Sequence, residues 1–240
     1  MMQKQVPAAA FSIILLFFTS CTARVSGSLA ADGQADLNIY AALEPRMSML
    51  IGTLAAASGT MPPGTPLLNG QAISASMSAA PGVASASLVN RTPSAIEGPV
   101  KISQINDFLA HGQTQGFISF EQSTASRDGR CAVNLSLDSG RDMLDLISPE
   151  IGEYLAALMA PIATGEAMTK AEYLDLAASV YGKGITDEIS QAVVRVSVNF
   201  PGQVRSAAGG TFSGRGAEFA IPLLDILVLE TSLNYEVVWR

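Results

Sequence analysis

The sequence predicts an α+β fold in which helices pack on one face of an antiparallel β-sheet. Apolar and polar residues alternate in several short segments, including residues 194–200, and this alternation is the period of a half-buried strand. Other segments, such as residues 150–159, carry apolar residues three and four positions apart, which is the period of an amphipathic helix. The order of these patterns recurs along the chain, so we expect two tandem ββααββ units.

The first 21 residues have the pattern of an export signal. Lys4 and the free amino terminus supply positive charge, and residues 8–18 form an apolar or weakly polar run of eleven residues. A helix needs roughly 20 apolar residues to cross a bilayer, so this run is too short for an ordinary membrane span. We therefore expect a signal peptide over residues 1–20.

The end of this segment, Phe18-Thr19-Ser20-Cys21, resembles the lipobox of bacterial lipoproteins, in which small residues precede a cysteine that is acylated after signal removal. The resemblance implies lipidation of Cys21, for example with palmitate, and a protein held at a membrane by its N-terminal acyl anchor. Phe18 departs from the leucine that the family favours. Thr22 is not the aspartate that retains some lipoproteins at the inner membrane. The resemblance therefore implies the cell envelope, at the outer membrane or the periplasmic face.

Two other interpretations of this segment stay open. Cys21-Thr22-Ala23 also has the small-x-small pattern of an ordinary signal peptidase site, which would release a soluble protein that begins at Arg24. A retained anchor helix is the other interpretation, and the thickness of the bilayer disfavours it. The lipidated form is the main hypothesis.

The acidic composition of the chain limits its partners. It has 14 Lys and Arg against 21 Asp and Glu, and loss of Lys4 with the signal leaves 13 against 21, a net charge of −8. Nucleic acid and anionic lipid repel such a charge, so we expect no nucleic-acid binding and membrane attachment through the acyl group. There are two cysteines, so acylation of Cys21 leaves Cys131 without a disulfide partner.

The first unit is expected over residues 21–112. Residues 24–43 have the pattern of a β-hairpin with its tight turn at Asp32-Gly33. A helix follows over residues 45–57, where apolar residues recur at helical spacing up to Gly59. The remaining elements are a proline-rich loop, a weak helix, two strands and a closing segment, at residues 60–70, 72–79, 83–89, 95–103 and 104–109.

The second unit, residues 113–240, restarts the same order, and the two units pack as one domain or as two. Asp128-Gly129 predicts a second tight turn, followed by a strand whose apolar face runs to residue 137. Ser148-Pro149 is a typical helix start, and Thr169 with Glu172 forms a capping box before another helix. Later strands are expected at residues 194–200, 203–207, 211–213, 218–221 and 233–239.

The two halves of the chain also resemble each other in sequence. A shift of 96 residues places residues 32–51 on residues 128–147 with six identities in twenty positions. A shift of 119 residues aligns residues 100–106 with residues 219–225. We interpret this pattern as an internal duplication in which the second copy has a longer helical part. The alternative is a chance similarity between two hairpin-and-helix patterns.

No residue pattern supports a catalytic or metal site, so we expect no enzyme and no cofactor. His111 is the only histidine and falls between the units, where a solvated linker residue is expected. Cys131 lies on an apolar strand face and is interpreted as a small buried hydrophobic residue. The acidic residues between 138 and 153 match no calcium loop. Residues 209–216 are rich in glycine and lead into a strand, so we expect a hairpin turn and no phosphate loop.

Apolar residues on the helices of the second unit are ordinarily core, but they could instead line a cavity for a lipid or another apolar ligand. The candidate residues for this pocket are Tyr154, Leu158, Met159, Tyr173, Leu174 and Tyr181. Residues 194–204, a strand that runs into Pro201-Gly202, together with residues 236–239, resemble the domain of LppM-type lipoproteins. That resemblance implies lipid binding.

The main functional hypothesis is a lipid-anchored envelope lipoprotein that acts as a non-enzymatic binding or structural module. Its partners would be the membrane and either a lipid or another envelope protein. The alternative is a carrier or sensor of a hydrophobic ligand, held in a cavity between the helices and the sheet. A hydrolase is the third hypothesis, and it needs convergent polar groups that the sequence does not supply.

Overall fold

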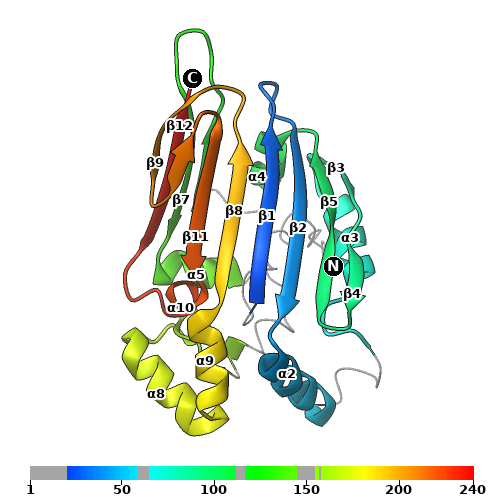
Figure 1. The fold of residues 1–240 in the computed structure, drawn as a ribbon, viewed down its shortest axis with the longest axis vertical. Coiled ribbons are helices and arrows are strands. Elements are labelled where there is room, and N and C mark those ends of the chain that lie inside the picture. Colours follow the sequence, from blue (N-terminus) through cyan, green and yellow to red (C-terminus); the bar gives the residue numbers. More distant parts are fainter. Residues whose placement is uncertain (1–20, 59–64, 112–116, 145–154, 157) are drawn as a thin grey trace, which may run out of the picture.

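The computed structural model describes residues 21–58, 65–111, 117–144, 155–156 and 158–240. Within these residues the predicted α+β fold is confirmed, because the chain forms two β-sheets and a set of helices (Figure 1). The predicted signal peptide and the predicted helix start at Ser148-Pro149 lie outside the described residues.

The larger sheet has eight strands in the order β10-β11-β8-β1-β2-β5-β3, with β4 paired to β5. Neighbouring strands are antiparallel except β1 and β8, which are parallel. The hairpin predicted over residues 24–43 is confirmed as β1 and β2, and Gly33 in its turn has a φ of 86°. The strands are β1 (Cys21–Leu29), β2 (Ala35–Leu43), β3 (Val83–Ala86), β4 (Val89–Thr92), β5 (Ala95–Ile102), β8 (Val193–Asn199), β10 (Thr211–Ser213) and β11 (Gly216–Pro222).

The smaller sheet is antiparallel and covers part of one face of the larger sheet. Its order is β6-β7-β12-β9, made of β6 (Ile118–Glu121), β7 (Gly129–Leu135), β9 (Val204–Ala208) and β12 (Leu233–Trp239). Val237 and Trp239 of β12 are buried in one apolar cluster with Val25 of β1 and Ala217 of β11. The two sheets therefore share a core.

The helices pack on the same face and at one end of the larger sheet (Figure 1). They are α2 (Pro45–Ser58), α3 (Gly70–Ser78), α4 (Ile105–His111), α5 (Leu137–Leu144), α7 (Pro161–Thr164), α8 (Lys170–Tyr181), α9 (Lys183–Gln191) and α10 (Leu223–Val228). Met77 of α3 and Phe108 of α4 are buried with Ile39 and Ile96 of the sheet. Figure 1 looks onto the opposite face, whose centre the described helices leave uncovered.

Two helix starts are stabilised in different ways. The capping box predicted for α8 is confirmed, because the Thr169 side chain accepts from the N–H of Glu172 and the Glu172 carboxylate accepts from the N–H of Thr169. The start of α2 instead uses a distant residue. The N–H groups of Arg46 and Met47 donate to the carboxylate of Glu188 at 2.9 and 2.8 Å. This contact ties α2 to α9, and a carboxylate at a helix N-terminus is electrostatically favourable.

Two local predictions in the second half are wrong. The expected tight turn at Asp128-Gly129 lies earlier, where the N–H of Thr124 donates to the carbonyl of Arg127 at 2.8 Å. Gly129 already belongs to β7, because its lack of a side chain makes room for Trp239 on the neighbouring strand. The strand expected to reach residue 137 ends two residues earlier and gives way to α5.

The larger sheet takes strands from both sides of the predicted boundary at residues 112 and 113. Strands β1 to β5 come from the first unit, and β8, β10 and β11 come from the second. The parallel pairing of β1 with β8 makes the connection. The division into residues 21–112 and 113–240 stays a prediction.

Trp239 anchors the interface between the sheets. It is fully buried, and its ring centroid lies 4.8 Å from that of Phe200 and 5.9 Å from that of Phe120. Gly129 is its register partner on β7, and a Cβ atom added at Gly129 would overlap the indole ring. This position therefore requires glycine for packing reasons.

We expect Gly129→Ala to lower the free energy of unfolding by about 1–3 kcal/mol, because the tightly packed ring must shift. Gly52→Ala is the matched control. A Cβ at Gly52 meets only the Cδ2 atom of Leu67 at 4.0 Å, and alanine favours a helix interior by roughly 0.5–1 kcal/mol. Urea unfolding followed by the fluorescence of Trp239, the only tryptophan, measures both. Equal stability of the two variants would contradict the packing argument.

Candidate functional site

The predicted pocket on the helical side consists largely of packed core. Leu158 and Tyr173 are buried in the apolar cluster at the helical end of the molecule, and Tyr181 packs against it. Met159 and Leu174 are half-buried, and Tyr154 lies outside the described residues. The Tyr173 hydroxyl has no hydrogen-bond partner among the described residues, and burial raises the pKa of Tyr173 above its usual value. The assignment of a ligand to these residues stays a prediction.

The other predicted positions are spread over the fold. Cys21 begins β1, paired with Leu43 of β2, and His111 is the last residue of α4. The glycine-rich segment forms the predicted hairpin, β10 against β11, with Gly214 in the turn at a φ of 58°. In the described part of the chain, no cluster of His, Cys, Asp or Glu could hold a metal ion. Among the described helices, none has the length and apolar character to cross a membrane.

An apolar cavity of about 160 Å³ lies between the two sheets. The larger sheet contributes residues of β8 and β11, and the smaller sheet contributes residues of β7 and β12. The lining residues are Cys131, Val133, Val196, Val198, Phe200, Phe219, Ile221, Tyr235, Glu236 and Val237. The rings of Phe219 and Tyr235 meet edge to face, with centroids 5.7 Å apart. The cavity can hold an aromatic ring or a short alkyl segment.

Cys131 faces this apolar cavity from β7. It is a free cysteine and is partly buried among apolar neighbours. Because an apolar environment disfavours a charged thiolate, burial raises the pKa of the Cys131 thiol to about 11. Cys131 is therefore a poor nucleophile at neutral pH, in agreement with its interpretation as a small hydrophobic residue.

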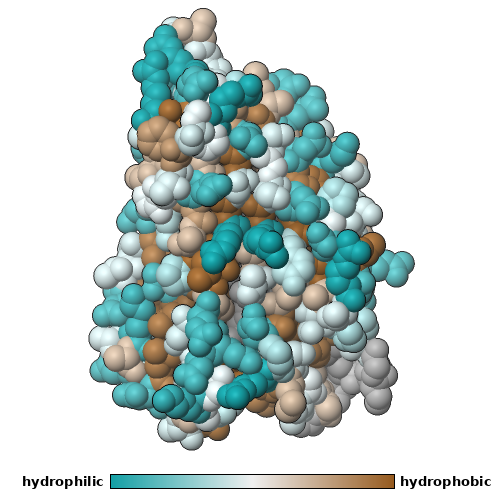
Figure 2. Space-filling view, in the orientation of Figure 1, coloured by the Kyte–Doolittle hydropathy of each residue, from teal (hydrophilic) through white to brown (hydrophobic). Residues whose placement is uncertain are grey.

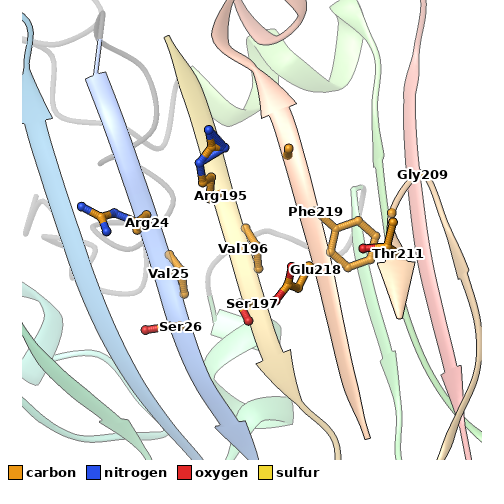
Figure 3. A pocket seen from close by; sticks show the side chains of 12 residues that line it. Arg24, Val25, Ser26, Arg195, Val196, Ser197, Gly209, Thr211, Glu218 and Phe219 are labelled. Atoms are coloured by element: carbon orange, nitrogen blue, oxygen red, sulfur yellow. The ribbon is translucent and has the colours of Figure 1, made fainter. Parts of the chain in front are cut away.

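A shallow groove of about 660 Å³ crosses the uncovered face of the larger sheet (Figure 3). It runs over β1, β8 and β11 and ends at the turn between β9 and β10. Its lining residues are Arg24, Val25, Ser26, Arg195, Val196, Ser197, Gly209, Gly210, Thr211, Glu218, Phe219 and Ala220. Figure 2 shows that hydrophilic side chains cover much of this face, with more apolar surface between them.

Two arginines lie side by side in this groove. Arg24 of β1 and Arg195 of β8 are register partners in the parallel pair, and both are exposed. The Arg24 guanidinium lies over the Tyr40 ring, 5.1 Å from its centroid. Further along the same face, Ser197 is the partner of Ser26 in β1 and of Glu218 in β11. The groove thus combines two cations, hydroxyl groups and one carboxylate.

Sequence reasoning did not single out either arginine. The alternation in residues 194–200 places Arg195 on the polar face of its strand, and this was correct. Arg24, however, meets Arg195 only because β1 pairs in parallel with a strand about 170 residues away in the chain. The sequence does show an arginine on the polar face of each of two strands. This pattern could have pointed to the pair, but it does not reveal that the two strands are neighbours.

The fold and these two cavities describe a small α+β domain with a sheet face open to solvent. No family model matches the chain, and no curated protein matches it. Among solved structures, the folded domain of the Mycobacterium tuberculosis LppM protein, determined by NMR, is similar to this chain. The TM-score is 0.38 and the identity is 12%, over 92% of this chain and 90% of that chain. This is a weak likeness at the level of the fold.

We expect native Cys131 to react with iodoacetamide at pH 8 about 100-fold more slowly than a thiol of ordinary pKa, because little thiolate is present. The rate should rise with pH and reach half of its maximum near the Cys131 pKa of about 11. Site-resolved mass spectrometry measures the rate, and the same protein in urea is the control. Equal native and urea rates at pH 8 would show that the thiol does not sense an apolar environment.

Proposed function

We propose that this protein is a lipid-anchored lipoprotein of the cell envelope that acts as a non-enzymatic binding module. The carrying observation is the position of the candidate acylation site. Strand β1 begins at Cys21, and the next residues are already held in the fold, since Thr22 Oγ1 donates to Glu44 Oε1 at 2.9 Å and Ala23 is buried. A lipid on Cys21 would therefore hold the central strand of the larger sheet at the membrane surface.

This geometry supports a specific orientation. Cys21 pairs with Leu43, directly before α2, and parallel β8 starts at the same end of the sheet, directly after α9. The end of the molecule with α2 and α9 would therefore face the bilayer. The uncovered sheet face and its groove would stand beside the membrane, accessible from the periplasm or the cell surface. The proposed location is the outer membrane or the periplasmic face.

The anchor is tested by Cys21→Ser. In a bacterial host that processes lipoproteins, the wild-type protein should incorporate labelled palmitate and fractionate with membranes, whereas Cys21→Ser should lose the label. Cys131→Ser is the matched control, because it removes the other thiol and should keep both label and fractionation. Palmitate in Cys21→Ser, or an unlabelled wild-type protein, would reject the lipoprotein assignment.

The second candidate function is that of a carrier or sensor of an apolar ligand, and the cavity between the sheets favours it. Its lining from β8, β11, β7 and β12 is almost entirely apolar. Ligand pockets are commonly about 300–1,000 Å³, and this cavity is smaller. It would hold part of a chain or ring, with the remainder of the ligand outside. The candidate ligand site of a carrier is therefore the cavity between the sheets, in addition to the site predicted among the helices.

We expect decanoic acid to slow the alkylation of Cys131 at pH 10, because an alkyl chain in the cavity covers the thiol. Val133→Phe should abolish this protection by filling the cavity from β7. Val89→Phe is the matched control, since Val89 is 50% exposed on β4 and outside the cavity lining. An alkylation rate that decanoic acid leaves unchanged in the wild-type protein would reject the carrier function for this cavity.

A further inference from the structure

We propose that Arg24 and Arg195 together bind one oxyanionic group, for which a phosphate is the best charge match, on the uncovered face of the larger sheet. The site is independent of the lipid anchor and of the apolar cavity between the sheets. It is formed by residues 171 positions apart in the chain, brought together as register partners on β1 and β8.

The register gives both guanidinium groups access to one ligand. Neighbouring strands are about 4.8 Å apart, and register partners project from the same face of a sheet. Figure 3 shows the two side chains on adjacent strands, with the Arg24 side chain directed toward β2 and away from Arg195. Each guanidinium offers a planar set of N–H donors that matches the oxygens of a phosphate. Both side chains are long and exposed, so rotation of Arg24 away from Tyr40 would let the two groups contact one tetrahedral anion from two sides.

The charges of the pair are not neutralised within the protein. Neither the Arg24 nor the Arg195 guanidinium forms an ion pair or a hydrogen bond with another described residue. Other arginines do form ion pairs with acidic residues, namely Arg91, Arg127, Arg130, Arg205 and Arg240. Like charges placed directly opposite each other destabilise a sheet. In a chain with 21 acidic residues against 14 basic ones, a bound anion removes a repulsion that the fold itself leaves in place.

The surroundings define the rest of the ligand. The Arg24 guanidinium lies over the Tyr40 ring of β2, so an anion bound between the arginines would replace this cation–π contact with contacts to the ligand. Ser26 and Ser197, the next register pair on this face, offer hydroxyl groups beside the arginines. Glu218 repels a second anion at that end and can accept a hydrogen bond from a ligand hydroxyl or amine. The groove therefore fits a phosphate ester whose alcohol part carries a donor, such as a glycerol phosphate.

This chemistry has two sources, a soluble phosphate ester and the headgroup of a lipid. Arg24 is three residues from Cys21, a distance of about 10 Å along an extended strand. If the anchor of the proposed function is present, the groove lies close to the headgroup layer of the bilayer, which extends roughly 5–8 Å beyond the hydrocarbon. The experiment therefore includes both sources.

The full-length protein in a phosphate-free, non-ionic detergent would be titrated with glycerol 3-phosphate and with short-chain phosphatidylglycerol, and binding followed by ³¹P NMR. We expect saturable binding of at least one probe, weakened about tenfold or more in Arg24→Ala and in Arg195→Ala. Arg195→Lys should bind with intermediate affinity, because it keeps the charge and loses the planar donors. Similar affinity for both probes identifies a soluble ester, and preference for the lipid identifies a headgroup.

Lys101→Ala is the matched control, because it removes one positive charge from β5 on the same face, outside the groove lining. It should bind phosphate like the wild-type protein. Equal weakening in Lys101→Ala would show attraction by general surface charge and would overturn the proposal, as would absence of saturable binding to both probes. Thermal unfolding checks that the variants are folded, because wild-type and Arg24→Ala proteins without ligand should unfold at similar temperatures. The ligand should raise the Tm of the wild-type protein and not that of Arg24→Ala.

Discussion

The parallel pairing of β1 with β8 is the contact on which the rest of the architecture depends. It joins residues 23–28 to residues 194–199, so most of the chain lies in the connection between the two strands. Parallel strands cannot be joined by a tight turn and need a long crossover. Here the crossover contains strands β2 to β5 of the larger sheet, strands β6 and β7 of the smaller sheet, and most of the described helices. Because β11 pairs with β8, the same contact also brings β10 and β11 into the larger sheet.

Each face of β8 contributes to a different cavity. Val196 and Val198 turn toward the smaller sheet and line the apolar cavity, whereas Arg195 and Ser197 turn outward and line the groove, which Val196 also borders. A shift of the register by one residue would exchange the two faces, burying charged groups and exposing valines. The apolar requirement of the core thus fixes the positions of the arginines. Binding chemistry on the uncovered face can therefore change without repacking the core.

The sequence similarity between the two halves falls on similar local structures with different partners. Residues 100–102 and 219–221 lie in β5 and β11, and a short helix follows each strand, α4 and α10 respectively. The first hairpin, β1-β2, lies in the larger sheet, whereas its counterpart in the alignment falls around β7 in the smaller sheet. Local patterns encode a hairpin or a strand followed by a helix, and the choice of sheet partner depends on which apolar faces remain to be covered.

The sequence by itself determined the α+β class, the first hairpin, the capping box of α8 and the polar face of β8. Each of these features depends on the period of the side chains or on hydrogen bonds between residues close in the chain. It misplaced the turn near Gly129, since that glycine responds to Trp239, more than 100 residues away. Only the tertiary structure decided the parallel pair, the cavity between the sheets, the Glu188 contact with α2 and the meeting of Arg24 with Arg195. These contacts join residues far apart in the chain, where local periodicity carries no information about which segments become neighbours.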